Sequence, residues 1–218
     1  MKLVDFIYPK SCVGCSQEGS FLCEECQSSL EIAEQICPMC GESSSFGWTH
    51  KGCLNPQGMY GLICVYEYQD EKVVKAIDEL KFGFNREIVP IILKDFVFET
   101  GVAFDAIVPM PLHFYRENWR GFNQAEVISI ALARKMGVPV EKWLKRVKIT
   151  KQQSMLRNRE ERVRNMSDAF VLDQGKLAEE KSILLVDDVF TSGVSMREAA
   201  KTLKRGGAKF VWGLVLAH

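Results

Sequence analysis

The sequence predicts an α/β protein in which a parallel sheet flanked by helices follows a small N-terminal zinc-ribbon-like module. Seven of the eight cysteines of the 218-residue chain lie before residue 54. Beyond residue 57, strand-like and helix-like segments alternate, and the strand-like segments are apolar throughout, as expected of parallel strands buried on both faces. We therefore divide the chain into a cysteine-rich zinc-binding module at 1–57 and an α/β domain at 58–218. The turn-rich NPQG of Asn55–Gly58 marks the boundary.

The N-terminal module contains four pairs of metal ligands, each with two residues between its members. The pairs are Cys12 with Cys15, Cys23 with Cys26, Cys37 with Cys40, and His50 with Cys53. This spacing lets both side chains of a pair face one metal ion, and Zn²⁺ prefers four such nitrogen and sulfur ligands. We expect one or two structural zinc ions, with sequential or interleaved pairing, rather than disulfides or a redox CxxC motif. Zinc would stabilise a module too small for a large core of its own.

The α/β domain divides into segments in chain order. Its first half reads as strand, helix, helix, strand and helix: GLICVYEY (61–68), EKVVKAIDELKF (71–82), REIVPIILKDFVFET (86–100, helical after Pro90), FDAIVPMP (104–111) and NQAEVISIALARKMG (123–137). Its second half reads as basic loop, strand, helix and strand: KRVKITKQQSMLRNREERVRN (145–165), SILLV (182–186), SMREAAKTLKRGG (195–207) and KFVWGLVLA (209–217). The predicted buried positions of the first and last helices are Val73, Val74, Ile77 and Leu80, and Met196, Ala199, Ala200 and Leu203. Cys64, within the first strand, is expected to be a small buried residue.

Two adjacent carboxylates end the predicted strand 182–186. Asp187 and Asp188 precede a loop of small and hydroxyl residues, FTSGVS (190–195), which leads into the last helix. Ligands of α/β folds bind at the carboxyl ends of parallel strands, and a glycine-containing loop at a helix N-terminus suits a phosphate. Carboxylates suit sugar hydroxyls or Mg²⁺. The combination predicts a site for a phosphorylated ribose. The absence of G-x-x-x-x-G-K-[ST] and G-x-G-x-x-G argues against a standard NTPase or dinucleotide site.

Longer motifs resemble known families. ILLVDDVFTSGVS (183–195) resembles the phosphoribosyl pyrophosphate (PRPP) motif of type I phosphoribosyltransferases. VPMPLHFYRENWRGFNQA (108–125), TKQQSMLRNREERVRNMSDAF (150–170) and the paired cysteines resemble the ComF family of competence proteins, ComFC-like members in particular. The resemblance covers nearly the whole chain. It implies a type I phosphoribosyltransferase fold that binds PRPP together with magnesium.

The resemblance also implies roles for individual residues. Asp187 and Asp188 would be the catalytic pair, which holds the ribose hydroxyls and helps to order Mg²⁺. The 5′-phosphate would be cradled by backbone N–H groups and hydroxyls of Phe190, Thr191, Ser192, Gly193, Val194 and Ser195. The pyrophosphate would lie on the loop Pro109–Leu112, which contains Met110 and Pro111, within reach of Arg116, Arg120 and Asn123. A flap at Thr150–Asn165 would cover the site with Gln153, Arg157, Arg162 and Asn165, and Lys81 is a further candidate.

The zero net charge conceals an uneven distribution. Residues 112–166 contain 13 Lys and Arg against 5 Asp and Glu, so this stretch carries +8 and the rest of the chain −8. The basic stretch is either a nucleic-acid or anion surface or a solvated surface with loops. No apolar run approaches the roughly 20 residues that span a bilayer, and MKLVDFIYPKS is too short for a signal peptide. We expect a cytoplasmic protein without membrane insertion.

Three functions remain open at this stage. The first is a PRPP-binding, phosphoribosyltransferase-like protein that acts in natural competence, in DNA uptake and transformation. The second is an active phosphoribosyltransferase in nucleotide metabolism, whose nitrogenous acceptor the sequence does not identify. The third is a non-catalytic module that binds single-stranded DNA or docks onto a competence helicase. A vestigial ligand site is the least attractive reading because Asp187 and Asp188 are both present.

Overall fold

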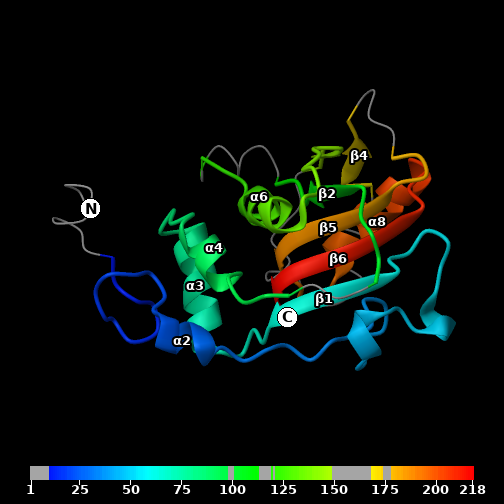
Figure 1. The fold of residues 1–218 in the computed structure, drawn as a ribbon. Helices are drawn as coiled ribbons and strands as arrows, with labels where there is room; N and C mark the ends of the chain where they lie inside the picture. Colours follow the sequence, from blue (N-terminus) through cyan, green and yellow to red (C-terminus); the bar gives the residue numbers. More distant parts are fainter. Residues whose placement is uncertain (1–9, 98–100, 113–118, 120, 149–167, 174–177) are drawn as a thin grey trace.

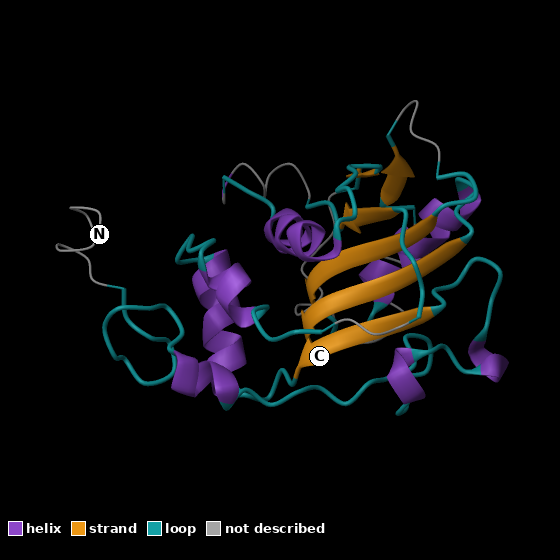
Figure 2. Ribbon diagram, in the orientation of Figure 1, coloured by secondary structure: helices purple, strands orange, loops and turns teal. Residues whose placement is uncertain are grey.

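The centre of the protein is a four-stranded parallel sheet in the order β1-β6-β5-β2 (Figures 1 and 2). The computed structural model describes residues 10–97, 101–112, 119, 121–148, 168–173 and 178–218. The strands of the sheet are β1 (Gly61–Tyr66), β2 (Ala106–Pro109), β5 (Ser182–Val189) and β6 (Phe210–Ala217). All residues of β1 and β2 are buried, which accounts for their uninterrupted apolar sequences. The predicted parallel sheet is confirmed.

Helices cover both faces of this sheet. They are α3 (Glu71–Lys81), α4 (Ile88–Ile92), α6 (Gln124–Met136) and α8 (Val194–Arg205). Side chains alternate along a strand, and in β5 Leu184 and Val186 share one core cluster with α3, α4 and α6. Ile183 and Leu185 share the opposite cluster with α8, which lies behind the sheet in Figure 1. Among the described residues, no helix combines the length and apolar character needed to cross a bilayer.

Local sequence signals set the helix ends. Asp70 and Asn123 each accept a hydrogen bond from the backbone N–H two residues further on, and so begin α3 and α6. Gly137 ends α6 in the left-handed conformation, with φ 70°. The apolar face of α3 forms largely as predicted, except that Val74 is half-buried and Ala76 is buried.

Three segments differ from the prediction. The short strands β3 (Leu144–Arg146) and β4 (Phe170–Leu172) pair antiparallel, although β3 starts the stretch expected to be loop. α4 carries its proline in the first turn, where no N–H donor is needed, and residues 93–97 are not helical, so the longer predicted helix is wrong. β5 continues through both aspartates to Val189, because Asp187 and Val189 remain paired with β6.

The N-terminal module covers the open edge of β1. It contains α2 (Glu24–Ser28) and the 3-10 turns η1 (Ser45–Gly47) and η2 (Lys51–Cys53). The Ala33 N–H donates to the Val65 carbonyl at 3.2 Å. The Gln35 side-chain amide donates to the Cys64 carbonyl at 2.7 Å and accepts from the Cys64 N–H at 3.1 Å. An unpaired strand edge can pair with other chains. Here the N-terminal module of the same chain occupies hydrogen-bonding groups along the edge of β1.

The module reaches both faces of the sheet as it passes this edge. Cys12 and Leu22 pack in the core cluster of α3 and α4, whereas Ala33 and Ile36 pack in the cluster of α8. Figure 1 shows the corresponding blue segment running from α2, beside α3, along β1. The two halves of the module therefore support opposite layers of the α/β domain.

Candidate ligand site and metal centres

The carboxyl end of β5 carries Asp187 and Asp188 at the middle of the sheet. β5 lies between β6 and β2. β6 continues beside the acids, whereas β2 ends at Pro109, opposite Val186. Asp188 pairs with Lys81 at the last residue of α3, with 3.0 Å between Oδ2 and Nζ. Both side chains of this pair are largely buried. The structure therefore brings the weakly indicated Lys81 into contact with the predicted acidic pair.

Asp187 has an unusual electrostatic environment. Burial, and then the negative charge of Asp188, raise the pKa of Asp187 from 3.8 to about 7. The Asp188 N–H donates to Asp187 Oδ1 at 3.0 Å and, together with the charges of Lys81 and Arg146, opposes this rise. A ligand that brings hydroxyl donors or a cation to Asp187 would stabilise its ionised form.

The loop after β5 combines buried anchors with accessible hydroxyls. Phe190 and Val194 are buried in the core, and the Phe190 N–H donates to the Ala217 carbonyl at 2.9 Å. The Phe190 N–H thus already has a partner in the sheet, and the predicted role of Phe190 in holding the phosphate stays a prediction. Thr191 is exposed, and Ser195, in the first turn of α8, is half-buried.

Gly193 fixes the entry into α8. It is the N-cap residue with φ 67° and ψ 0°, in the left-handed region. An added Cβ would overlap the Phe190 ring and would lie 2.6 Å from Nη1 of Arg197. Both the backbone conformation and the lack of space therefore require glycine. The first turn of α8 follows directly and presents N–H groups that have no partner within the helix.

The loop Pro109–Leu112 lies beside the acidic pair, as expected from the strand order. The Met110 N–H donates to the Val186 carbonyl at 2.8 Å, and the Met110 carbonyl accepts from Nδ2 of Asn123 at 2.9 Å. Asn123 is buried, and its Oδ1 caps α6. The amide of Asn123 thus holds this loop against α6, and its predicted contact with pyrophosphate stays a prediction.

A pocket of about 390 Å³ opens next to this loop. Its lining includes Pro109, Pro111 and Leu112 on one side and β3 with Arg146 on the other. Arg146 was not among the predicted site residues, and its charge acts on Asp187. In WLKRV two apolar residues precede two basic ones, so no alternation marked this segment as a strand.

Several predicted contacts fall outside the described residues. Arg116 and Arg120 belong to this group, as does the expected flap, with Gln153, Arg157, Arg162 and Asn165. Their roles stay predictions.

Two clusters of metal ligands form in the N-terminal module. The first cluster is Cys12, Cys15, Cys23 and Cys26, and the second cluster is Cys37, Cys40, His50 and Cys53. In each cluster the four ligand atoms lie within 4.8 Å of one another. This is the sequential pairing, so interleaved pairing is excluded.

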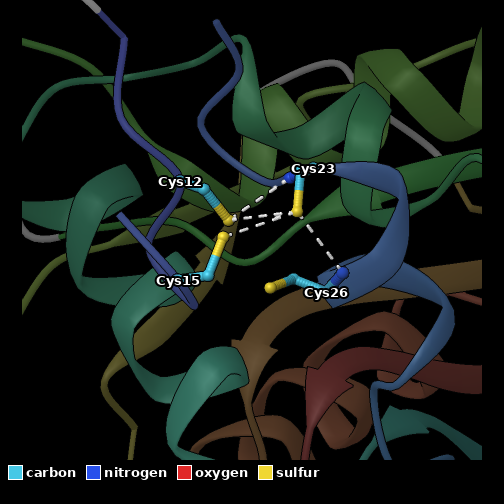
Figure 3. Close-up of side chains that lie close together, drawn as sticks. All are labelled: Cys12, Cys15, Cys23 and Cys26. Carbon is cyan, nitrogen blue, oxygen red and sulfur yellow. Dashed lines mark hydrogen bonds between the residues drawn. The ribbon is translucent and has the colours of Figure 1, made fainter. Parts of the chain in front are cut away.

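The first cluster has the dimensions of a zinc site. Cys23 Sγ lies 3.7 Å from both Cys12 Sγ and Cys15 Sγ (Figure 3). Zn–S bonds of about 2.3 Å at tetrahedral angles would place sulfur atoms roughly 3.8 Å apart. The Cys23 N–H donates to Cys12 Sγ at 3.3 Å, and the Cys26 N–H to Cys23 Sγ at 3.5 Å, which favours thiolates.

A residue outside the second cluster orients the histidine of this cluster. His50 Nδ1 lies 3.5 Å from Cys40 Sγ, and Nε2 lies 3.1 Å from the Ser43 carbonyl. A proton on Nε2, donated to this carbonyl, would leave the Nδ1 lone pair facing the sulfurs, as in protein zinc sites. The set of three sulfurs and one nitrogen therefore fits zinc.

The thiol pKa values differ within each cluster. For Cys12 and Cys37, burial disfavours the thiolate, but donating N–H groups, led by those of Cys23 and Cys40, lower the pKa values to about 6 and about 7. Sharing of a proton with Cys23 raises the pKa of Cys26 to about 12. Metal binding must displace such protons, so affinity should rise with pH.

A known family matches the N-terminal part of the chain. Residues 3–64 match the double zinc ribbon domain family, and the two clusters form structural zinc sites of this kind. Among solved structures, the chain is similar to glutamine phosphoribosylpyrophosphate amidotransferase from B. subtilis, with a TM-score of 0.39 and 14% identity. The match covers 91% of this chain and 33% of that chain, so the protein spans about a third of that enzyme's length.

Relatives along the whole chain carry names related to DNA uptake. Competence protein F of Haemophilus influenzae is 29% identical, over 90% of either chain. Competence protein ComFC of Bacillus subtilis is 27% identical, over 85% of this chain and 79% of the relative. DNA utilization protein YhgH of Escherichia coli K12 is 30% identical, over 87% of either chain. Together with the double zinc ribbon module, these matches show that the chain belongs to the ComF family.

Proposed function

We propose that this protein binds PRPP and acts, as a phosphoribosyltransferase-like protein of the cytoplasm, in natural competence and DNA uptake. One observation carries the PRPP assignment: the carboxyl end of β5 presents Asp187 and Asp188 directly before a hydroxyl-lined loop at the N-terminus of α8. The names of the relatives carry the cellular role. The eight cysteines, all described and all without disulfide bonds, agree with a reducing compartment.

The site residues have complementary tasks in this proposal. Asp187 and Asp188 accept hydrogen bonds from the ribose hydroxyls, and their carboxylate oxygens are ligands that Mg²⁺ prefers. Bound Mg²⁺ would neutralise charge on the pyrophosphate. Thr191 and Ser195 donate hydroxyls to the 5′-phosphate, and the first turn of α8 adds its backbone donors. Lys81 restrains Asp188 until the ligand arrives.

Transfer chemistry would use the same groups. The bond between ribose C1 and the pyrophosphate oxygen breaks, and a bond from C1 to an acceptor nitrogen forms, through an oxocarbenium-like transition state. Such a reaction depends on orientation and on charge stabilisation of the leaving group. Arg146 supplies positive charge near the acids. Pyrophosphate release that requires both Mg²⁺ and an acceptor is the measurement that separates turnover from binding alone.

Calorimetry with PRPP and Mg²⁺ tests the proposed ligand. We expect micromolar to millimolar binding by the wild type and none by Asp187→Asn combined with Asp188→Asn, because neutral amides lack the charge that holds Mg²⁺ and strengthens hydrogen bonds from hydroxyl donors. Asp78→Asn removes an exposed carboxylate of α3 and serves as the control. Equal heats for the wild type and the double variant would refute the assignment. In a transformation assay, the double variant should fail to complement a deletion strain.

Single-stranded DNA is the second candidate ligand, on the evidence of charge. The +8 stretch at 112–166 contains Lys142 and Lys145 on the described surface, and Trp119 is 69% exposed. Basic grooves with exposed aromatic side chains bind single strands by phosphate contacts and base stacking. We expect fluorescence anisotropy to show binding to a labelled oligonucleotide that weakens steeply with salt. Binding that does not depend on the salt concentration would contradict the proposal that this basic surface binds single-stranded DNA.

A further inference from the structure

One arginine joins the second cluster to the proposed phosphate loop. Arg197 lies in the first turn of α8, and its half-buried guanidinium donates to two carbonyl groups. Nη1 donates to the Pro38 carbonyl at 2.7 Å, and Nη2 donates to the Ser192 carbonyl. Pro38 and Arg197 are 159 positions apart in the sequence. This contact connects the N-terminal module with the loop that would hold the 5′-phosphate.

The Pro38 carbonyl belongs to the metal-binding turn itself. Pro38 lies between the ligands Cys37 and Cys40. The Cys37 N–H donates to the Glu42 carbonyl at 2.8 Å, and the Gly41 N–H donates to the Cys37 carbonyl at 2.9 Å. These bonds close the turn around the two ligands. Loss of zinc would release the sulfurs from one another, so the position of the Pro38 carbonyl depends on the metal.

The Ser192 carbonyl controls a donor on the other side of its peptide plane. In a trans peptide the C=O and N–H groups point in opposite directions. The Ser192 carbonyl faces Arg197, so the Gly193 N–H faces away from it. Glycine populates positive and negative φ about equally, so the peptide before Gly193 can flip easily. The bond from Arg197 therefore selects one orientation of a donor at the start of α8.

The same two regions share a core. Ile36 of the N-terminal module belongs to one buried cluster with Phe190 and Met196, and so does Met59, just after the module. An added Cβ at Gly213 would lie 2.5 Å from Met59 Cε and 2.9 Å from Met196 Cε, so both methionines pack over that glycine. The guanidinium contact thus lies at the edge of a packed interface, where a shift in one part moves the other.

We infer that Arg197 couples zinc at the second cluster to ligand binding at the phosphate loop. The coupling positions the Ser192–Gly193 peptide and rests on the proposed function for its ligand, PRPP. Coupling between sites is reciprocal. Zinc at the second cluster should therefore strengthen PRPP binding, and PRPP should retain zinc there by the same factor. Arg197 is a positioning residue in this scheme and transmits the effect without contacting the reacting atoms.

Titration of PRPP with Mg²⁺ into four variants tests the coupling. Cys40→Ser removes an exposed ligand of the second cluster, and Arg197→Met keeps the aliphatic stem but removes both donors. We expect each to weaken PRPP binding about tenfold, and their combination to weaken it no further, because both break one connection. Arg197→Lys keeps the charge but lacks the fork that spans two carbonyls, so it should not restore affinity. Full recovery with lysine, or additive losses, would overturn the inference.

Hydrogen–deuterium exchange measures the protection of the loop amides in the absence of PRPP. Exchange of the amides in 190–197 should accelerate in Arg197→Met and in Cys40→Ser, and by a similar factor. Arg205→Met, at the other end of α8, is the matched control and should leave the loop unchanged. Unchanged exchange in both test variants would reject the coupling. If the wild type fails to bind PRPP while the loop still responds, the proposed ligand is wrong and the coupling stands.

Discussion

Asp187 and Asp188 are neighbours with different surroundings. Successive side chains of a strand point to opposite faces, and Asp188 meets Lys81 of α3 at 3.0 Å. Asp187 gains less compensation, and burial together with the charge of Asp188 raises its pKa to about 7. Asp187 therefore keeps a proton near neutral pH more readily than an ordinary aspartate does, and a bound cation would displace that proton.

The raised pKa of Asp187 predicts a pH-dependent stability. Between about pH 4 and pH 7 the folded protein keeps this proton, whereas the unfolded chain, with an aspartate pKa near 4, has lost it. The free energy of unfolding contributed by Asp187 therefore falls as the pH rises through this window. Asp187→Asn avoids the buried charge, so its Tm in Mg²⁺-free buffer should exceed that of the wild type by a few degrees at pH 8. The difference should shrink toward pH 5.

A second variant serves as the control for thermal melts across this pH range. Asp78→Asn removes an exposed carboxylate from α3, so its Tm difference from the wild type should not vary over the same window. A difference for Asp187→Asn that is constant with pH, or a lower Tm than the wild type at pH 8, would contradict the buried-charge explanation.

Among the helices and strands, the elements that could be predicted are those with a long hydrophobic pattern in the sequence. β1 and β6 have long apolar runs, and α3 has a regular stripe, so the sequence placed each of them correctly. β3 and β4 are three residues each, and Leu144 pairs with Leu172 far along the chain. So short a strand has no periodicity of its own, and only its partner makes it a strand. The continuation of β5 through its acids likewise depends on pairing with β6.

The same distinction applies to the candidate site. The metal clusters could be predicted because each ligand pair is local, with both members on one turn. The contact of Lys81 with Asp188, and the charge of Arg146 near Asp187, come from elements that meet only in the folded sheet. The bond from the Asn123 amide to the Met110 carbonyl likewise forms only in the folded sheet, whereas its cap on α6 is local.

At the scale of the molecule, the N-terminal module acts as a clamp on one sheet edge. Its first cluster lies with α3 and α4, beside contacts such as Glu24 with Lys94 at 3.1 Å. Its second cluster adjoins α8 through Arg197. Between them, Gln35 completes the backbone edge of β1. Each cluster therefore supports a different layer, and the loss of either one should destabilise a different part of the protein.

Elemental analysis and melting of matched variants test this arrangement. We expect two zinc ions in the wild type and one in either Cys15→Ser or Cys40→Ser. Both positions are exposed ligands, so little packing is lost with the thiol. Each variant should melt well below the wild type, because zinc binding contributes directly to folding.

In hydrogen–deuterium exchange, Cys15→Ser should loosen α3 and α4, and Cys40→Ser should loosen the start of α8. Cys64→Ala removes a buried thiol that belongs to neither cluster and should leave the zinc content unchanged. A well-folded wild-type preparation without zinc would show that the module holds the edge of β1 without metal. That result would contradict the supporting role of the two clusters.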